Sequence, residues 1–255
     1  EVLGAFLRGQ VLVMIALAFI YSLGLSLVGV EFAIAIGVVS GVTMSFQFGT
    51  NWPGFIERAG NITGPLLGFE VLTAFFLEAV FIGIMLFGVS RVPGWLHMLA
   101  TGLVAFGTTM SAFWIIVLNS WMQTPAGFAI DPVTGQAVLT DVWAAVFNPS
   151  TVDRLIHTIL GAWQAGAFFV ISVGAWYLLQ GRHRDFAIAS MKVALVVAMI
   201  SSLGQLVSGH SNAVMVAEHQ PAKLAAFEGI YETGASADLT IVGWVDEGSQ
   251  QVHGI

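Results

Sequence analysis

The chain has 255 residues, of which 57% are hydrophobic and only 9% are charged, with a net charge of −7. Soluble domains carry about 25% charged residues, so this composition excludes an ordinary soluble enzyme and indicates a polytopic membrane protein. The chain has no cysteine, which excludes disulfides, thiolate nucleophiles and thioether-linked haem. No basic patch is interleaved with aromatic residues, so nucleic acid is not expected as a partner.

The long apolar runs predict an all-α fold, a polytopic membrane helical bundle of about six transmembrane helices. A span needs about 20 predominantly apolar residues. The first two runs form either a tight hairpin that turns at residues 29–31 or one kinked pair of segments. The polar residues after Val207 are expected outside the membrane. The expected helices cover residues 11–28, 32–48, 64–88, 95–118, 154–179 and 186–207.

Basic residues in the short loops predict how the helices are oriented. Arg182, Arg184 and the nearby Lys192 favour a cytoplasmic loop between the fifth and sixth helices. Counting back through alternating helices puts the loop with Arg91 on the same side. The long connection 119–153 and the C-terminal tail then face outward.

The run 64–88 carries two carboxylates, Glu70 and Glu78, inside an otherwise apolar helix. A carboxylate in a span costs roughly 2–3 kcal/mol or more unless it is paired, protonated or hydrated. A spacing of eight residues is just over two helical turns, so both side chains point to broadly the same side. Two interpretations follow: a polar groove between packed helices, or a proton or cofactor site that faces the bundle interior.

His157 is the one histidine that falls just inside a predicted helix in an apolar context. An imidazole embedded in the membrane suits an axial haem ligand, and equally a side chain bonded to a backbone carbonyl near the interface. Gly161 and Gly166 on the same helix leave room either for a flat macrocycle or for a neighbouring helix. From the residues alone, the alternatives are balanced.

In the tail, Lys223 and Glu228 lie five residues apart on a short amphipathic stretch with Phe227 and Tyr231. Such a set can bind a polar aromatic headgroup near the outer surface. The alternative is a solvated helix face.

Five blocks of sequence resemble subunit I of the cytochrome bd quinol oxidases, in the order and spacing of that family. Together they cover residues 37–255. The blocks are MSFQFGTNW from Met44, GFEVLTAFFLEAVF from Gly68, SAFWIIVLNSWMQTP from Ser111, RLIHT from Arg154 and QPAKLAAFEG from Gln220.

The resemblance implies a role for each candidate residue. His157 matches an axial ligand of the low-spin haem b. Glu70 and Glu78 match two glutamates tied to haem binding and proton delivery, and Lys223 and Glu228 match the quinol-binding loop. Members of the family oxidise quinol and reduce oxygen to water, with two haems b and one haem d. They pair with a second membrane subunit in the bacterial inner (cytoplasmic) membrane.

The chain also departs from the family pattern. The resemblance implies a haem-ligating histidine on the first helix, but no histidine precedes His97. The methionine that partners His157 and a further glutamate ligand are expected beyond Ile255. We therefore expect an incomplete oxygen-reduction half, whether or not the chain is active as an enzyme by itself.

Residues 1–41 are similar to a segment of the autoinducer-2-exporter-type permeases, with LRGQ at residues 7–10. This predicts a permease-like segment at 1–36, an oxidase-type bundle at 37–208 and the start of the quinol-binding loop at 209–255. The alternatives to an oxidase subunit are a permease-like transporter and an inactive chimeric or truncated fragment that keeps only the fold.

Overall fold

A computed structural model describes residues 51–231, 242–249 and 251–254. The two predicted N-terminal helices, the permease-like segment and its junction at residues 37–41 lie outside the described residues. The chain divides into two compact units, Glu1–Thr151 and Val152–Ile255. Within the described residues, three helices are long and apolar enough to cross a membrane: α5 (Gly94–Gln123), α7 (Thr151–Leu179) and α8 (Arg184–His219). The predicted helical membrane fold is confirmed.

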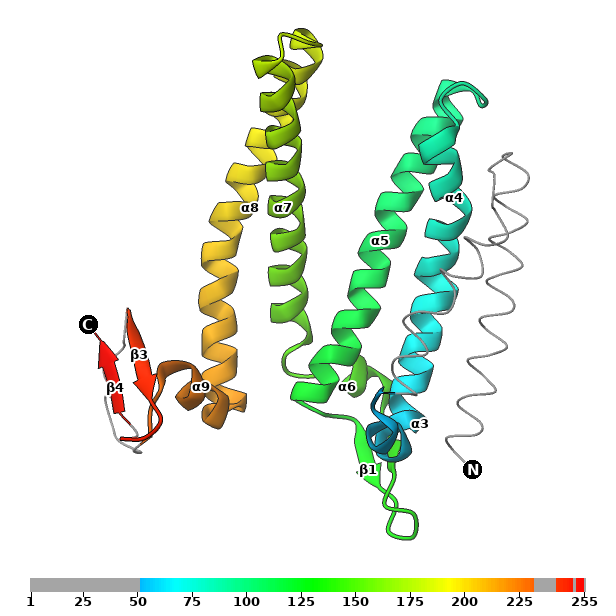
Figure 1. Ribbon diagram of the computed structural model, residues 1–255. Helices are drawn as coiled ribbons and strands as arrows, with labels where there is room; N and C mark the ends of the chain where they lie inside the picture. The colour runs from blue at the N-terminus through cyan, green and yellow to red at the C-terminus, as the bar shows by residue number, and fades with distance from the viewer. Residues whose placement is uncertain (1–50, 232–241, 250, 255) are drawn as a thin grey trace. The chain divides into compact units, whose positions relative to one another are not determined.

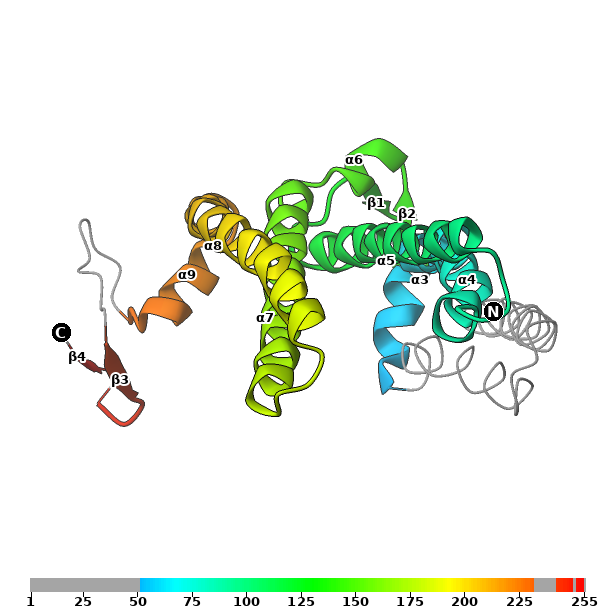
Figure 2. The ribbon, with the colours of Figure 1, turned by 90° about the horizontal axis from the view of Figure 1, so that it is seen from above.

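The first unit begins with a continuous helical segment that contains both predicted glutamates. It consists of α3 (Pro53–Glu70), the π-helix η1 (Val71–Phe75) and α4 (Phe76–Phe87). The sequence predicted one helix over residues 64–88, but helix formation starts earlier, at Pro53. A proline is tolerated at the first helical position because that N–H has no intrahelical partner. The loop 88–93 then reverses the chain, and α4 and α5 lie side by side (Figures 1 and 2).

The core of the first unit lies between α3, α5 and the extramembrane segment that follows them. Ile62 and Leu66 of α3 pack with Val117 and Trp121 of α5, and all four side chains are at most 5% exposed. Each such side chain contributes about 1.5–3 kcal/mol when it is buried from water. This cluster fixes the end of α5 against α3.

The connection 119–153, predicted as a loop, has secondary structure of its own. Strands β1 (Phe128–Ile130) and β2 (Ala137–Leu139) pair antiparallel, and the short helix α6 (Val142–Val146) follows. The Asp141 carboxylate caps α6 by accepting from the N–H groups of Trp143 and Ala144. Gly127 adopts φ +69°, and a Cβ there would collide with the Asp141 carbonyl. Only glycine suits this position.

A buried polar cluster ties the end of α5 to the residues just before α7. The Thr124 hydroxyl lies 3.0 Å from Asn148 Oδ1 and 2.7 Å from Ser150 Oγ. The Asn148 amide donates to the Ala145 carbonyl at 3.0 Å. All three polar side chains are buried, and their mutual hydrogen bonds offset the cost of removing them from water.

The second unit is an antiparallel pair of long helices with a short extramembrane end. The loop 180–183 joins α7 to α8, and α9 (Pro221–Glu228) turns back from the end of α8 (Figure 1). Strands β3 (Gly243–Asp246) and β4 (Gln251–Gly254) form a second hairpin. Where α7 and α8 pack together, Ala167, Ala194 and Ala198 are buried, because small side chains let two helices approach closely in a membrane.

The length of α8 places one end of the second unit at the membrane boundary. Its 36 residues span about 54 Å at 1.5 Å per residue, whereas the hydrocarbon core is about 30 Å thick. The C-terminal turns of α8, the start of α7 and α9 therefore lie at one end of the spans. The sequence placed the end of this helix at Val207, about three turns too early.

Candidate functional site

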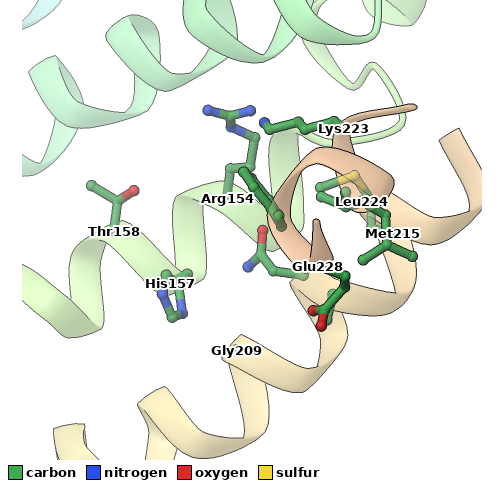
Figure 3. Close-up of a pocket in the computed structure, with 12 residues that line it drawn as sticks. Arg154, His157, Thr158, Gly209, Met215, Lys223, Leu224 and Glu228 are labelled. Carbon is green, nitrogen blue, oxygen red and sulfur yellow. The ribbon is translucent and has the colours of Figure 1, made fainter. Parts of the chain in front are cut away.

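A cavity of about 390 Å³ lies at this end of the second unit, among α7, α8 and α9 (Figure 3). Its size falls within the ordinary range of small-molecule sites, about 300–1,000 Å³. Three of the five predicted site residues line it: His157, Lys223 and Glu228. We call it the α7–α9 pocket. It is lined by Arg154, His157 and Thr158 of α7, by Gly209, Asn212, Ala213, Met215 and Val216 of α8, and by Lys223, Leu224, Phe227 and Glu228 of α9.

Helical periodicity explains why these residues share one pocket. On α7, Arg154 and Thr158 are four residues apart, with His157 between them, so the three side chains share a face. On α8, Gly209, Asn212, Ala213 and Val216 repeat at intervals of three and four. The short turn at Gln220 then lays α9 across this end of the helix pair.

The His157 ring is held against α8 by a hydrogen bond. Its Nδ1 lies 2.9 Å from Ser208 Oγ, and the same hydroxyl points to the Gln205 carbonyl at 3.4 Å. A Cβ on Gly209 would lie 3.6 Å from His157 Cε1, so the ring passes close to the α8 backbone. In the tautomer in which Ser208 accepts the Nδ1–H of His157 and donates to the Gln205 carbonyl, Nε2 keeps its lone pair.

The backbone of α7 around His157 is also fixed by α8. The Gln205 side-chain amide donates to the His157 carbonyl at 2.8 Å. A Cβ on Gly161 would lie 2.8 Å from Gln205 Nε2, so this glycine makes room for the neighbouring helix. The sequence left open whether Gly161 makes room for a flat macrocycle or for a neighbouring helix, and in the structure it makes room for α8. Near Gly166 a Cβ would meet nothing within 4 Å.

The start of α7 has two further ties to α8. The Ser211 hydroxyl donates to the Asp153 carboxylate, and the Asn212 amide donates to the Asp153 carbonyl at 3.0 Å. These bonds hold Arg154, the next residue, at the edge of the α7–α9 pocket. Arg154 is half-buried.

On α9, Lys223 and Glu228 extend to different sides of the pocket. The Lys223 ammonium lies 5.6 Å from the centre of the Phe227 ring and 3.5 Å from the Gln220 side-chain oxygen. In Figure 3, the ends of Lys223 and Arg154 lie on one side of the pocket, and the Glu228 carboxylate lies on the other, toward Gly209. The pocket therefore has a cationic side and an anionic side.

Glu70 and Glu78 belong to the first unit, where both face α5. The Ser111 hydroxyl donates to Glu70 Oε1 at 2.8 Å, and Glu70 is only 3% exposed. A Cβ on Gly107 would lie 3.1 Å from Glu78 Cγ, so Glu78 packs where α5 has no side chain. Gly107 and Ser111 are four residues apart on one face of α5, and the two glutamates lie along that stripe.

The π-helix between the two glutamates contributes to this alignment. A π turn closes i→i+5 hydrogen bonds, so the chain rotates less per residue than in an α-helix. The offset between Glu70 and Glu78 is therefore smaller than regular α-helical spacing gives, and the side chains point to the same side, as the spacing predicted. Such π turns are frequent at functional sites.

The donor set of the α7–α9 pocket fits a haem better than a bare metal ion. Within the residues that the structure describes, no group of three or more His, Cys, Asp or Glu side chains is arranged to hold a metal ion. A macrocycle supplies four donors of its own, so one protein imidazole suffices on one face. A ring fixed through Nδ1, with a lone pair on Nε2, matches what metal-binding histidines need.

Several residues of these sites were not found from the sequence. Arg154 stood three positions before His157, a spacing that could have indicated a shared face. Ser208 and Gln205 contact His157 across about 50 residues of sequence, and Ser111 contacts Glu70 across 41. No local pattern signals such pairs.

Comparisons with known proteins agree with this architecture. The family described as cytochrome bd terminal oxidase subunit I matches residues 20–255. The chain is 41% identical over 226 residues to cytochrome bd-II ubiquinol oxidase subunit 1 of Escherichia coli (strain K12), covering 88% of this chain and 44% of that protein. It is 42% identical over 213 residues to cytochrome bd ubiquinol oxidase subunit 1 of Bacillus subtilis (strain 168), covering 83% and 45%.

A solved structure is also similar, the bd oxidase from Geobacillus thermodenitrificans. The TM-score is 0.75 at 29% identity, over 94% of this chain and 58% of that one. The chain thus spans about half the length of the proteins it matches.

The family match begins at residue 20, ahead of the junction predicted at residues 37–41, so part of the permease-like segment falls within the match. The proposed domain boundaries stay a prediction. Matches to the family model and to relatives at 41% and 42% identity agree with the predicted resemblance and with the helical membrane fold. The chain belongs to the cytochrome bd terminal oxidase subunit I family, a family of helical membrane proteins that the name itself marks as haem-bearing oxidases.

Proposed function

We propose that this chain carries the quinol-binding and haem-holding part of a terminal respiratory oxidase in the bacterial inner membrane. The observation that carries the proposal is that one pocket brings together His157, Lys223 and Glu228. Family membership favours this function over a permease-like transporter. It also favours the oxidase over a fragment that keeps only the fold.

His157 would hold a low-spin haem b through Nε2, with Ser208 orienting the ring. When bound, such a group supplies a carrier of single electrons. The chain's own residues do the remaining work: the α9 side of the α7–α9 pocket, away from the haem that His157 would hold, binds the quinol headgroup. There Glu228 accepts a hydrogen bond from a quinol hydroxyl. Phe227, 66% exposed, adds an apolar wall for an aromatic ring.

Glu70 and Glu78 would handle protons in the first unit. The Glu70 carboxyl accepts a hydrogen bond from the Ser111 hydroxyl, which supports a fixed orientation of this carboxyl group. Glu78 faces the same stripe of α5. A carboxyl inside a membrane segment that can gain and lose a proton is a common element of proton pathways. Oxygen, a second haem b, haem d and a second membrane subunit belong to the complete enzyme that this proposal assumes.

The visible absorption spectrum of the protein, purified with whatever subunits accompany it, tests the haem assignment. We expect an absorption band of low-spin haem b in the reduced protein, and we expect His157→Ala to abolish that band. His97→Ala serves as a control, because the His97 ring already bonds the Met85 carbonyl at 2.9 Å. A band that survives His157→Ala unchanged would remove His157 from this role.

A further inference from the structure

We infer that Arg154 is a specificity-determining residue of the α7–α9 pocket: it binds the ring oxygen of a 1,4-quinol at the end opposite to Glu228. The inference rests on the proposed function, since it names how the same pocket recognises its ligand. It starts from the placement of Arg154 on the pocket face of α7, in the same turn as His157.

Neighbouring contacts fix the helical turn of α7 that carries Arg154. The two hydrogen bonds from Ser211 and Asn212 to Asp153 hold the first turn of α7 against α8. Arg154 is half-buried, and its guanidinium lies on the same side of the pocket as the Lys223 ammonium (Figure 3). The guanidinium is therefore presented to a ligand from a fixed helical turn.

The charges around the pocket select a ligand with polar groups at two ends. Glu228 accepts hydrogen bonds when ionised, whereas Arg154 and Lys223 only donate. A 1,4-quinol has one oxygen at each end of a flat ring. One hydroxyl can donate to Glu228 while the distant oxygen accepts from the cationic side. Phe227 and Leu224 also line the pocket, and their apolar side chains suit the ring itself.

Arg154 and Lys223 contribute differently to this recognition. The guanidinium is a planar fork with five N–H donors, which fixes the direction of an acceptor, whereas the ammonium is a flexible point charge. We therefore assign directional recognition of the distant oxygen to Arg154, and a supporting positive charge to Lys223.

The test compares two ligands on matched variants of the full protein in detergent. The ligands are a short-chain 1,4-benzoquinol and the corresponding phenol that lacks one hydroxyl, with binding measured by calorimetry under reducing conditions. The variants are Arg154→Gln, which removes the charge, and Arg154→Lys, which keeps the charge and loses the fork. Arg182→Gln is the control, because Arg182 is exposed in the loop at the other end of α7.

We expect the unaltered protein to bind the quinol about tenfold more tightly than the phenol, as a charge-assisted hydrogen bond implies. Arg154→Gln should remove most of this preference, Arg154→Lys should keep part of it, and Arg182→Gln should leave it intact. If Arg154 only supported the structure, Arg154→Gln would weaken the binding of quinol and of phenol equally, and the preference for quinol would remain. That result would overturn the inference.

Two further outcomes separate this inference from the proposed function. If Glu228→Gln and Lys223→Ala weaken quinol binding while Arg154→Gln keeps the full preference, the inference is wrong and the quinol site stands. If no variant of the three residues changes quinol binding, the proposed function fails with it. A last measurement adds phosphatidylglycerol, an anionic lipid, to the protein and tests which ligands displace it. If phosphate displaces this lipid and quinol does not, the cationic side of the pocket binds a lipid headgroup, and the inference is overturned. If Arg154→Gln does not fold, Arg154→Lys decides by the same comparison.

Discussion

Ser208 is the hydrogen-bond partner of His157 Nδ1, so replacing Ser208 tests the haem assignment without removing the proposed ligand. Ser208→Ala deletes the partner of Nδ1, which lies 2.9 Å away. Loss of such an outer contact typically costs 10–100-fold in metal affinity, so we expect about a tenfold weaker haem affinity. Titration with haem, followed by absorption, measures it. Ser172→Ala is the control, because that hydroxyl bonds only within its own helix, to the Phe168 carbonyl. Equal affinities for both variants would show that Ser208 does not orient the ring.

Asp131 is the residue that makes the first hairpin sensitive to pH. Its carboxylate accepts from the N–H groups of Val133 and Thr134, and these bonds lower its pKa below the ordinary 3.8. Because the folded pKa is lowered, the stabilisation is present above the unfolded pKa and is lost as the pH falls through the folded one. Asp131→Asn should speed amide exchange of residues 128–139 at neutral pH. The difference from the unaltered protein should shrink below about pH 4. A difference that is the same at pH 7 and at pH 2 would contradict this.

At the scale of elements, the approach of α4 to α5 depends on Gly107. A Cβ there would lie 3.1 Å from Glu78 Cγ, 3.2 Å from the Ala74 carbonyl and 3.2 Å from Leu77 Cβ. One of these three neighbours is backbone, so Gly107→Ala forces the atoms around it to give way, and we expect a cost of about 1–3 kcal/mol. We expect a lower melting temperature. Gly102→Ala on the same helix meets nothing within 4 Å and should be neutral or slightly stabilising. Equal melting temperatures for the two variants would mean that α4 and α5 are not closely packed at Gly107.

The second hairpin packs against the end of α9, next to Glu228. Gly229 adopts φ +65°, and a Cβ there would collide with Val252 and lie 3.1 Å from Val245 Cγ2. Gly229→Ala therefore adds a steric conflict to the backbone strain of about 1–2 kcal/mol. Gly135→Ala is the control, because Gly135 has nearly the same φ, +68°, and a Cβ there would meet nothing within 4 Å. This substitution therefore adds backbone strain without a steric conflict. We expect Gly229→Ala to weaken quinol binding several-fold and Gly135→Ala to leave it unchanged. If both substitutions changed quinol binding equally, the packing of the second hairpin against α9 would have no influence on the quinol site.

At the scale of the whole molecule, the sequence predicted the elements well and their contacts only in part. Apolar runs identified the helices because a membrane span must be about 20 apolar residues long. The eight-residue spacing placed Glu70 and Glu78 on one side, and both face α5. The C-terminal end of α8 was missed because polar residues continue this helix beyond the membrane. The hairpin in the connection before α7 was missed because strands of three residues leave almost no pattern in the sequence. Contacts such as Gln205 to the His157 carbonyl join distant segments, which periodicity cannot pair.

The central claim is that the candidate haem ligand and the candidate quinol residues act in one pocket. The most direct measurement is the absorption spectrum of the purified protein, titrated with a non-reducing quinol analogue. Because His157 and Glu228 line the same pocket, the account predicts a His157-dependent haem band that shifts as the analogue binds. The shift should require about tenfold more analogue in the Glu228→Gln variant. A haem band that depends on His157 but does not respond to the analogue, or responds equally in Glu228→Gln, would contradict the account.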